Sequence, residues 1–185
     1  MTERLKAGAI APDFSFDSPW KKGLKLSGFT KKGTTVLMFL RYMGCPVCQM
    51  KIAELRKEIG EFTRRKVNLL VVLQSTPDNV CRAVSEKDIP FVIVCDPKEK
   101  LFALYDVKPG SIFRYVTPNS IIQAVKATIR GFKHGRFEGN EKQLPAAFII
   151  DTGRRVRWAH YGANVSDVPK TKKLLAELDR TEKAR

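Results

Sequence analysis

The chain has 185 residues, enough for one domain with a buried core, and we expect residues 1–185 to form a single domain. Its 34 lysines and arginines against 19 aspartates and glutamates give a net charge of +15. The basic residues are scattered and have no aromatic stacking pattern or reading motif beside them, so we expect no nucleic-acid partner. Residues 1–10 lack the apolar core of a secretion signal, and no run approaches the ~20 apolar residues that span a bilayer. These features predict a cytoplasmic protein without a membrane partner.

The first two thirds of the chain alternate between extended and helical patterns. Extended pieces are predicted at 11–16 and 24–26, joined as a hairpin, and the unbroken apolar run at 36–40 indicates a strand buried on both faces. Apolar positions at helical spacing predict one long helix from Pro46 to beyond Phe62. Further expected elements are strands at 67–73 and 91–95, a helix from Pro77 to about Lys87 and a short helix at 101–105. This order predicts parallel strands covered by helices.

Residues 109–143 are less regular, and we interpret them as an inserted helical flap. Thr117 and Pro118 are a helix-start signal, and the helix that follows has one apolar face made of Ile121, Ile122, Val125, Ile129 and Phe132. Residues 133–143 are rich in glycine and charge, which predicts a surface loop with His134 in solvent.

The chain then returns to regular elements. A strand at 144–150 and its antiparallel partner at 156–161 are predicted, followed by a helix with its leucines inward.

Two cysteines stand one helical turn apart where the buried strand passes into the long helix. Cys45 and Cys48 flank Pro46, a residue suited to the first turn of a helix. Unpaired amides at a helix N-terminus favour the reactive thiolate, so the spacing predicts a redox-active pair. The same spacing occurs in half of a zinc site, but Cys81 and Cys95 do not supply the other half because thirteen residues separate them. We therefore expect no metal and no cofactor.

Cys81 and Cys95 are interpreted as small, buried core residues, since free cysteine is among the most buried residue types. Cys95 ends a predicted strand, and functional residues gather at the carboxyl ends of strands in open α/β sheets. A reserve role in resolving an oxidised thiol therefore stays open for Cys95.

Four stretches resemble the alkyl hydroperoxide reductase and thiol-specific antioxidant family, the peroxiredoxin-like redoxins of thioredoxin fold. They are Ala11-Pro12-Asp13-Phe14, Phe39 to Cys48, Pro90 to Pro97 and Leu144 to Gly153. The resemblance implies an α/β thioredoxin-like fold, with a central mixed sheet, helices on both faces and the inserted flap at 109–143. It also implies an antioxidant thiol oxidoreductase, with a homodimer as the assembly expected from its relatives.

The resemblance is a hybrid of two patterns. On the peroxiredoxin pattern, Cys48 falls on the peroxide-attacking cysteine, while Arg41 replaces a proline, Cys45 replaces a threonine and Pro145 stands where an arginine is expected. On the thioredoxin pattern, Cys45 and Cys48 are the reactive pair, and Pro145 matches a cis-proline that faces them.

Each pattern implies a catalytic cycle. In the thioredoxin-like cycle, Cys45, the more exposed thiol, attacks a substrate disulfide, Cys48 resolves the mixed disulfide and Pro145 shapes the substrate groove. In the peroxidatic cycle, Cys48 attacks a hydroperoxide and Cys45 condenses with the resulting sulfenic acid, while Arg41 lowers the thiolate pKa and orients the peroxide. Both cycles end in a Cys45–Cys48 disulfide, which a thioredoxin- or glutathione-type reductant would reopen. A redox-sensing interaction protein remains a further alternative.

Overall fold

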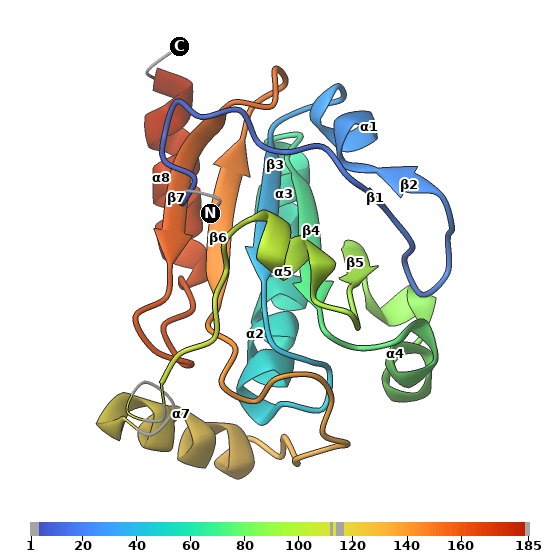
Figure 1. Cartoon of the computed structure of the whole chain (residues 1–185), viewed down its shortest axis with the longest axis vertical. Coiled ribbons are helices and arrows are strands. Elements are labelled where there is room, and N and C mark those ends of the chain that lie inside the picture. Colours follow the sequence, from blue (N-terminus) through green and yellow to red (C-terminus); the bar gives the residue numbers. More distant parts are fainter. Residues whose placement is uncertain (1–3, 112, 114–116, 184–185) are drawn as a thin grey trace.

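A mixed sheet of five strands forms the centre of the molecule, in the order β5-β4-β3-β6-β7 (Figure 1). The computed structural model describes residues 4–111, 113 and 117–183. Three strands run parallel, and two antiparallel strands extend the sheet on the other side of β3. The strands are β3 (Thr35–Phe39), β4 (Asn68–Leu73), β5 (Val92–Cys95), β6 (Ala146–Ile150) and β7 (Val156–Tyr161). The predicted mixed sheet is confirmed.

Helices cover both faces of this sheet, because successive strand residues point to opposite sides and both sides are apolar. One face packs against α2 (Pro46–Lys57), α3 (Ile59–Arg64), α4 (Pro77–Ala83) and α8 (Thr171–Lys183), and Leu55, Phe62, Val80 and Leu174 lie in that core. The other face packs against α1 (Leu26–Thr30) and α5 (Lys100–Leu104), with the small hairpin β1 (Ser15–Phe16) and β2 (Leu24–Lys25). Figure 1 shows α5 in front of the sheet and α2 behind it.

Several predicted boundaries are corrected. The long helix after the cysteines is two helices, because Glu58 leaves helical geometry at φ −105° and ψ 11° between α2 and α3. The helix that Thr76 caps ends at Ala83 rather than Lys87, since Val84 is extended, and a 3₁₀ turn follows at Glu86–Asp88. Leu26, expected at the end of an extended piece, begins α1.

The inserted flap contains α7 (Pro118–Ile129), which starts where the sequence predicts. The Thr117 side chain accepts a hydrogen bond from the Ser120 amide at 3.0 Å, and the Thr117 amide donates one to the Ser120 hydroxyl at 2.8 Å. Residues 112 and 114–116 of the predicted flap lie outside the described residues. In Figure 1, α7 lies at one end of the molecule, beyond the ends of the strands. None of the helices in the described part of the chain is long and apolar enough to cross a membrane.

Candidate active site

Cys45 and Cys48 lie at the predicted turn, between the end of β3 and the start of α2. Cys45 is the N-cap of α2, and its sulfur accepts a hydrogen bond from the Cys48 amide at 3.4 Å. Pro46 occupies the first turn, where a missing amide hydrogen costs no helical bond. The parallel strand β3 thus delivers the pair to the carboxyl end of the sheet, where the helix N-terminus favours negative charge on sulfur.

Arg41 stands directly against the first of the two thiols. Its Nη2 donates to the Cys45 sulfur at 2.9 Å, within a buried cluster. The hydrogen bond from the Cys48 thiol, together with the Arg41 charge, outweighs the cost of burial and lowers the pKa of Cys45 to about 6. Burial and the neighbouring Cys45 raise the pKa of Cys48 well above its usual range. At neutral pH the pair is therefore a Cys45 thiolate beside a protonated Cys48.

Both thiols are buried, which corrects the expectation that Cys45 is the more exposed. Cys45 is 0% exposed and Cys48 is 4% exposed. Residues 133–143 cross the turn, and most of this loop is itself exposed on the surface, His134 included, as the sequence predicts. The Gly135 amide donates to the Gly44 carbonyl at 2.8 Å, and a Cβ on Gly44 would collide with the Arg136 backbone. The loop therefore closes over the turn at van der Waals contact.

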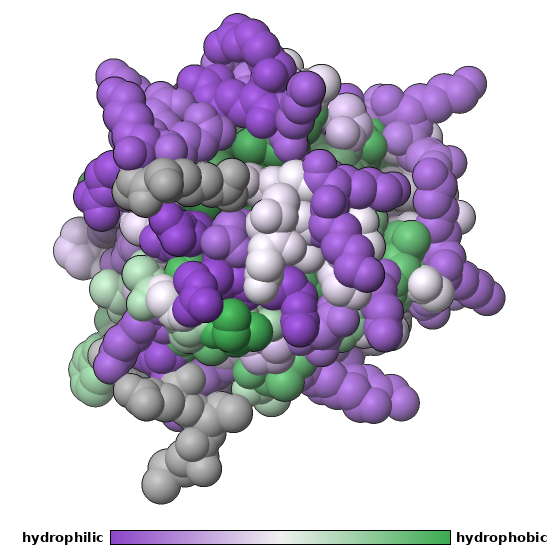
Figure 2. Space-filling view, turned by 90° about the horizontal axis from the view of Figure 1, so that it is seen from above, coloured by the Kyte–Doolittle hydropathy of each residue, from purple (hydrophilic) through white to green (hydrophobic). Residues whose placement is uncertain are grey.

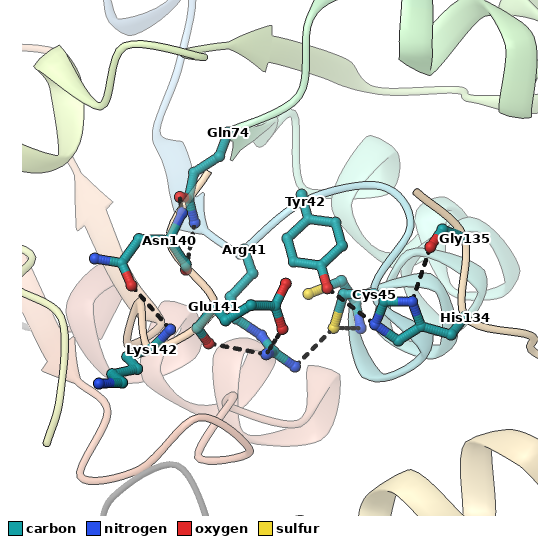
Figure 3. A network of polar contacts seen from close by, with 10 residues as sticks. Arg41, Tyr42, Cys45, Gln74, His134, Gly135, Asn140, Glu141 and Lys142 are labelled. Carbon is teal, nitrogen blue, oxygen red and sulfur yellow. Dashed lines mark hydrogen bonds and ion pairs between the residues drawn. The ribbon is translucent and has the colours of Figure 1, made fainter. Parts of the chain in front are cut away.

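Polar side chains of this loop reach the residues around Cys45 (Figure 3). Arg41 Nη1 donates to the Glu141 carbonyl at 3.0 Å and lies 3.4 Å from the Glu141 carboxylate. The Tyr42 hydroxyl lies 3.0 Å from Nε2 of His134. Burial and the Glu141 carboxylate raise the pKa of Tyr42, so its hydroxyl keeps its proton. Arg41 is thus held between the Cys45 sulfur and an acid from the covering loop.

A second set of contacts fixes the far part of the loop to the segment after β4 and to the first turn of α4. The Glu138 carboxylate accepts hydrogen bonds from the Ser75 hydroxyl at 2.7 Å and from the Asn79 amide side chain at 2.5 Å. The Ser75 hydroxyl in turn accepts from the Met43 amide at 2.8 Å, beside the cysteine turn. These bonds couple the position of the cover to the conformation of the turn.

Sequence reasoning found Arg41, Cys45 and Cys48 and missed Tyr42, His134, Glu138 and Glu141. The missed residues of the covering loop are about one hundred positions from Arg41 in the chain, and nothing in their local pattern links them to the thiols. Of the missed residues, Tyr42 could have been suspected from the sequence, because it directly follows Arg41 in the turn between the strand and the reactive helix.

Pro145 does not have the predicted cis geometry. Every peptide bond between described residues is trans, including the one before Pro145. Pro145 is buried, and its carbonyl accepts a hydrogen bond from the Gly162 amide at 2.8 Å. That bond continues the pairing between β6 and β7 and is satisfied with the proline in the trans form. A role for Pro145 in a substrate groove stays a prediction.

The other two cysteines differ from expectation. Cys81 is exposed rather than buried, and its sulfur lies 3.7 Å from the Pro19 carbonyl. Cys95 is half-buried, and burial raises its pKa to about 12, which keeps it a protonated thiol. Across the residues that the structure describes, no three histidine, cysteine or acidic side chains gather closely enough to hold a metal ion.

The chain is similar to a known protein family. The model of the AhpC/TSA family matches residues 7–159. A relative from Buchnera aphidicola, named for peroxiredoxin bcp, is 27% identical over 109 residues, which are 59% of this chain and 68% of the relative.

Two solved structures share the fold. BcpB, a peroxidoxin from Mycobacterium tuberculosis, has 18% sequence identity and a TM-score of 0.68, over 96% of this chain and 98% of its own. A mitochondrial 1-Cys peroxiredoxin from yeast has 16% identity and a TM-score of 0.73, over 97% of this chain and 78% of its own. At these identities the structural matches establish the thioredoxin-like fold.

Proposed function

The chain belongs to the AhpC/TSA family and is a peroxiredoxin-like thiol oxidoreductase, and from that premise we propose that Cys45 is its attacking nucleophile and Cys48 its resolving thiol. The observation that carries the proposal is the Cys45 sulfur, which accepts hydrogen bonds from Arg41 and Cys48 and has its pKa lowered to about 6. The order is the reverse of the one that the peroxiredoxin sequence pattern assigns, in which Cys48 attacks.

The proposed substrate is a hydroperoxide. The Cys45 thiolate attacks one peroxide oxygen, an S–O bond forms as the O–O bond breaks, and the departing oxygen takes up a proton and leaves as an alcohol or water. The Cys48 thiol then attacks the sulfenic sulfur of Cys45, which forms the disulfide and releases water. A thioredoxin- or glutathione-type thiol supplies the two electrons that reopen the disulfide.

Burial of the nucleophile supports a small substrate. Cys45 is 0% exposed under the covering loop 133–143, so a hydroperoxide needs a much smaller opening than a disulfide on a protein surface. Arg41 is placed to stabilise the thiolate and the negative charge that develops on the leaving oxygen, because its Nη2 donates to the Cys45 sulfur while its Nη1 contacts Glu141. Regeneration by a thiol reductant also fits a cytoplasmic protein, and a homodimer remains the oligomeric state that its family suggests.

The test is single-turnover peroxide reduction in a Cys81→Ser background, which removes the exposed thiol. With Cys48→Ser added, we expect one equivalent of hydrogen peroxide to be consumed and a sulfenic acid to be trapped by dimedone on Cys45. With Cys45→Ser added, we expect neither. Mass spectrometry of the trapped peptide locates the adduct. An adduct on Cys48 in the Cys45→Ser protein would contradict the proposed assignment of Cys45 as the attacking thiol.

A second candidate function is reduction of disulfides without peroxidase activity. The pair supports it because a low-pKa first cysteine and a high-pKa second cysteine are the order that thioredoxin-type exchange uses. If peroxide oxidises neither thiol, whereas the reduced protein cleaves a small aromatic disulfide and Cys45→Ser abolishes that cleavage, this second function replaces the first.

A further inference from the structure

The helix α7 has its apolar face turned to solvent. Ile121, Ile122, Val125 and Ile129 are 54%, 49%, 52% and 79% exposed, whereas Ala127, on the opposite side, is fully buried. At 3.6 residues per turn, the four apolar residues fall within an arc of about 100°. We call these four residues the α7 apolar face. An apolar stripe of this kind normally faces a protein core, so its exposure needs a physical reason.

The inner side of α7 gives part of that reason, because it is polar. Gln123, Lys126 and Arg130 line a cavity of about 480 Å³ between α7, α2 and the segment before α8. Asn119 is tied to this segment by a hydrogen bond to the Ser166 hydroxyl at 2.9 Å. The helix is therefore held in its orientation by polar contacts, and the α7 apolar face is left for something outside the chain.

The segment of chain that carries the α7 apolar face is basic, while Glu54 and Asp167 line the cavity on the inner side of α7. Residues 117–137 contain four cations, Lys126, Arg130, Lys133 and Arg136, and no aspartate or glutamate. The whole chain carries +15. A partner for this surface must accept apolar side chains and also present negative charge around them.

We propose that the α7 apolar face docks on the surface of a membrane containing anionic lipids, with α7 lying in the interface plane. The four apolar side chains would enter the boundary between headgroups and acyl chains, and the exposed Lys126, Lys133 and Arg136 would reach the level of the anionic headgroups. The two signals together are what reversible attachment needs, since neither a small apolar insertion nor a basic patch holds a protein firmly alone.

A second copy of the chain fits the α7 apolar face less well. A symmetric pairing would set two acid-free basic segments against each other. The position of α7 suits a flat surface, because it lies at one end of the molecule (Figure 1), while hydrophilic residues dominate the opposite end (Figure 2).

Co-sedimentation of the full chain with vesicles tests the proposal. We expect binding to vesicles of phosphatidylcholine mixed with phosphatidylglycerol, little binding to phosphatidylcholine alone, and weaker binding as salt rises from about 0.05 M to about 0.5 M. Ile122→Gln/Ile129→Gln should weaken binding to the mixed vesicles by about tenfold or more. The control Ile10→Gln changes an isoleucine that is 51% exposed elsewhere and should leave binding unchanged.

Two further double variants test the contribution of positive charge to vesicle binding. Lys126→Gln/Arg130→Gln should weaken binding to the mixed vesicles, whereas Lys31→Gln/Lys32→Gln removes the same charge from an exposed site on α1's side of the molecule and should have a smaller effect. Equal losses in both double variants, or binding that is unaffected by Ile122→Gln/Ile129→Gln, would show unspecific attraction and overturn the proposal. A dimer in sedimentation equilibrium that dissociates in Ile122→Gln/Ile129→Gln would assign the face to a second copy and also overturn it. Circular dichroism checks that each variant is folded.

Discussion

The helices α2 and α7 begin in the same way and end in opposite environments. Each has 12 residues, a proline in its first turn and a capping side chain that accepts from an amide three residues on, Cys45 in α2 and Thr117 in α7. Yet α2 buries Ile52 and Leu55 in the core, whereas the α7 apolar face is exposed. Among described residues, no side chain of α7 belongs to either core cluster.

The comparison teaches that a local pattern specifies where a helix starts and which residues share a face, but not what that face meets. Capping depends on hydrogen bonds within one turn, which the sequence contains completely. The direction of the apolar face depends on which surface is available, and the sheet is already covered by α2, α3, α4 and α8 on that side. The helix α7 therefore packs on α2 with its polar side and does not pack on the sheet.

The largest difference should appear in stability. Replacing the fully buried Leu55 by alanine leaves a cavity in the core, and we expect the free energy of unfolding to fall by about 3 kcal/mol. Ile129→Ala, on the exposed side of α7, should change it by less than about 0.5 kcal/mol. Urea denaturation followed by circular dichroism measures both, and similar losses in the two variants would mean that α7 is buried in solution.

A smaller but chemically specific difference concerns the charge beside each helix start. Arg41→Met should raise the pKa of Cys45 from about 6 by about one to three units, because an opposite charge within hydrogen-bond distance is lost. The thiolate is present above the pKa and lost as pH falls through it, so alkylation of Cys45 at pH 7 should slow by about twofold to a hundredfold.

The pH profile of iodoacetamide alkylation is the measurement for Arg41→Met, in the Cys81→Ser background. The midpoint should lie near pH 6 with Arg41 present and move upward without it. Arg56→Met, on the exposed surface of α2, serves as control and should keep the original midpoint. A midpoint that stays near pH 6 in Arg41→Met would assign the acidity of Cys45 to Cys48 and the helix N-terminus alone.

The loop across the cysteine turn distinguishes α2 further. Gly44→Ala places a methyl group against the Arg136 backbone, so we expect a loss of about 1–3 kcal/mol and faster alkylation of Cys45 as loop 133–143 is displaced. Gly60→Ala, within α3, meets nothing within 4 Å and should be stabilising by about 0.5–1 kcal/mol. Slower alkylation in Gly44→Ala would contradict the covering role of the loop.

The smallest expected effect concerns the cap of α7. Thr117→Ala removes the acceptor for the Ser120 amide and should destabilise α7 by about 1 kcal/mol. Since α7 lies outside both cores, the loss should appear as faster amide exchange within 118–129, with an unchanged urea midpoint for the whole protein. A shifted global midpoint would show that α7 unfolds together with the sheet.

Much of the fold followed from the sequence by itself. Apolar runs without alternation located β3, β4, β5 and β6, and the cap signals of Thr76 and Thr117 located the starts of α4 and α7. The spacing of Cys45 and Cys48 after a buried strand placed a dithiol at a helix N-terminus. These properties depend on neighbours within one turn or one strand, so they are legible in a short stretch of residues.

The tertiary structure decided the properties that depend on distant residues. Loop 133–143 lies over the turn with the buried Cys45 and brings Glu141 to Arg41 and His134 to Tyr42. The partners in these two contacts are about one hundred residues apart in the sequence. The order of the two thiol pKa values follows from the hydrogen bond between the thiols, the burial of Cys48 and the Arg41 contact with Cys45, and the spacing alone leaves this order open. The outward direction of α7 was likewise set by the surfaces already occupied on the sheet, because packing depends on what the rest of the chain leaves uncovered.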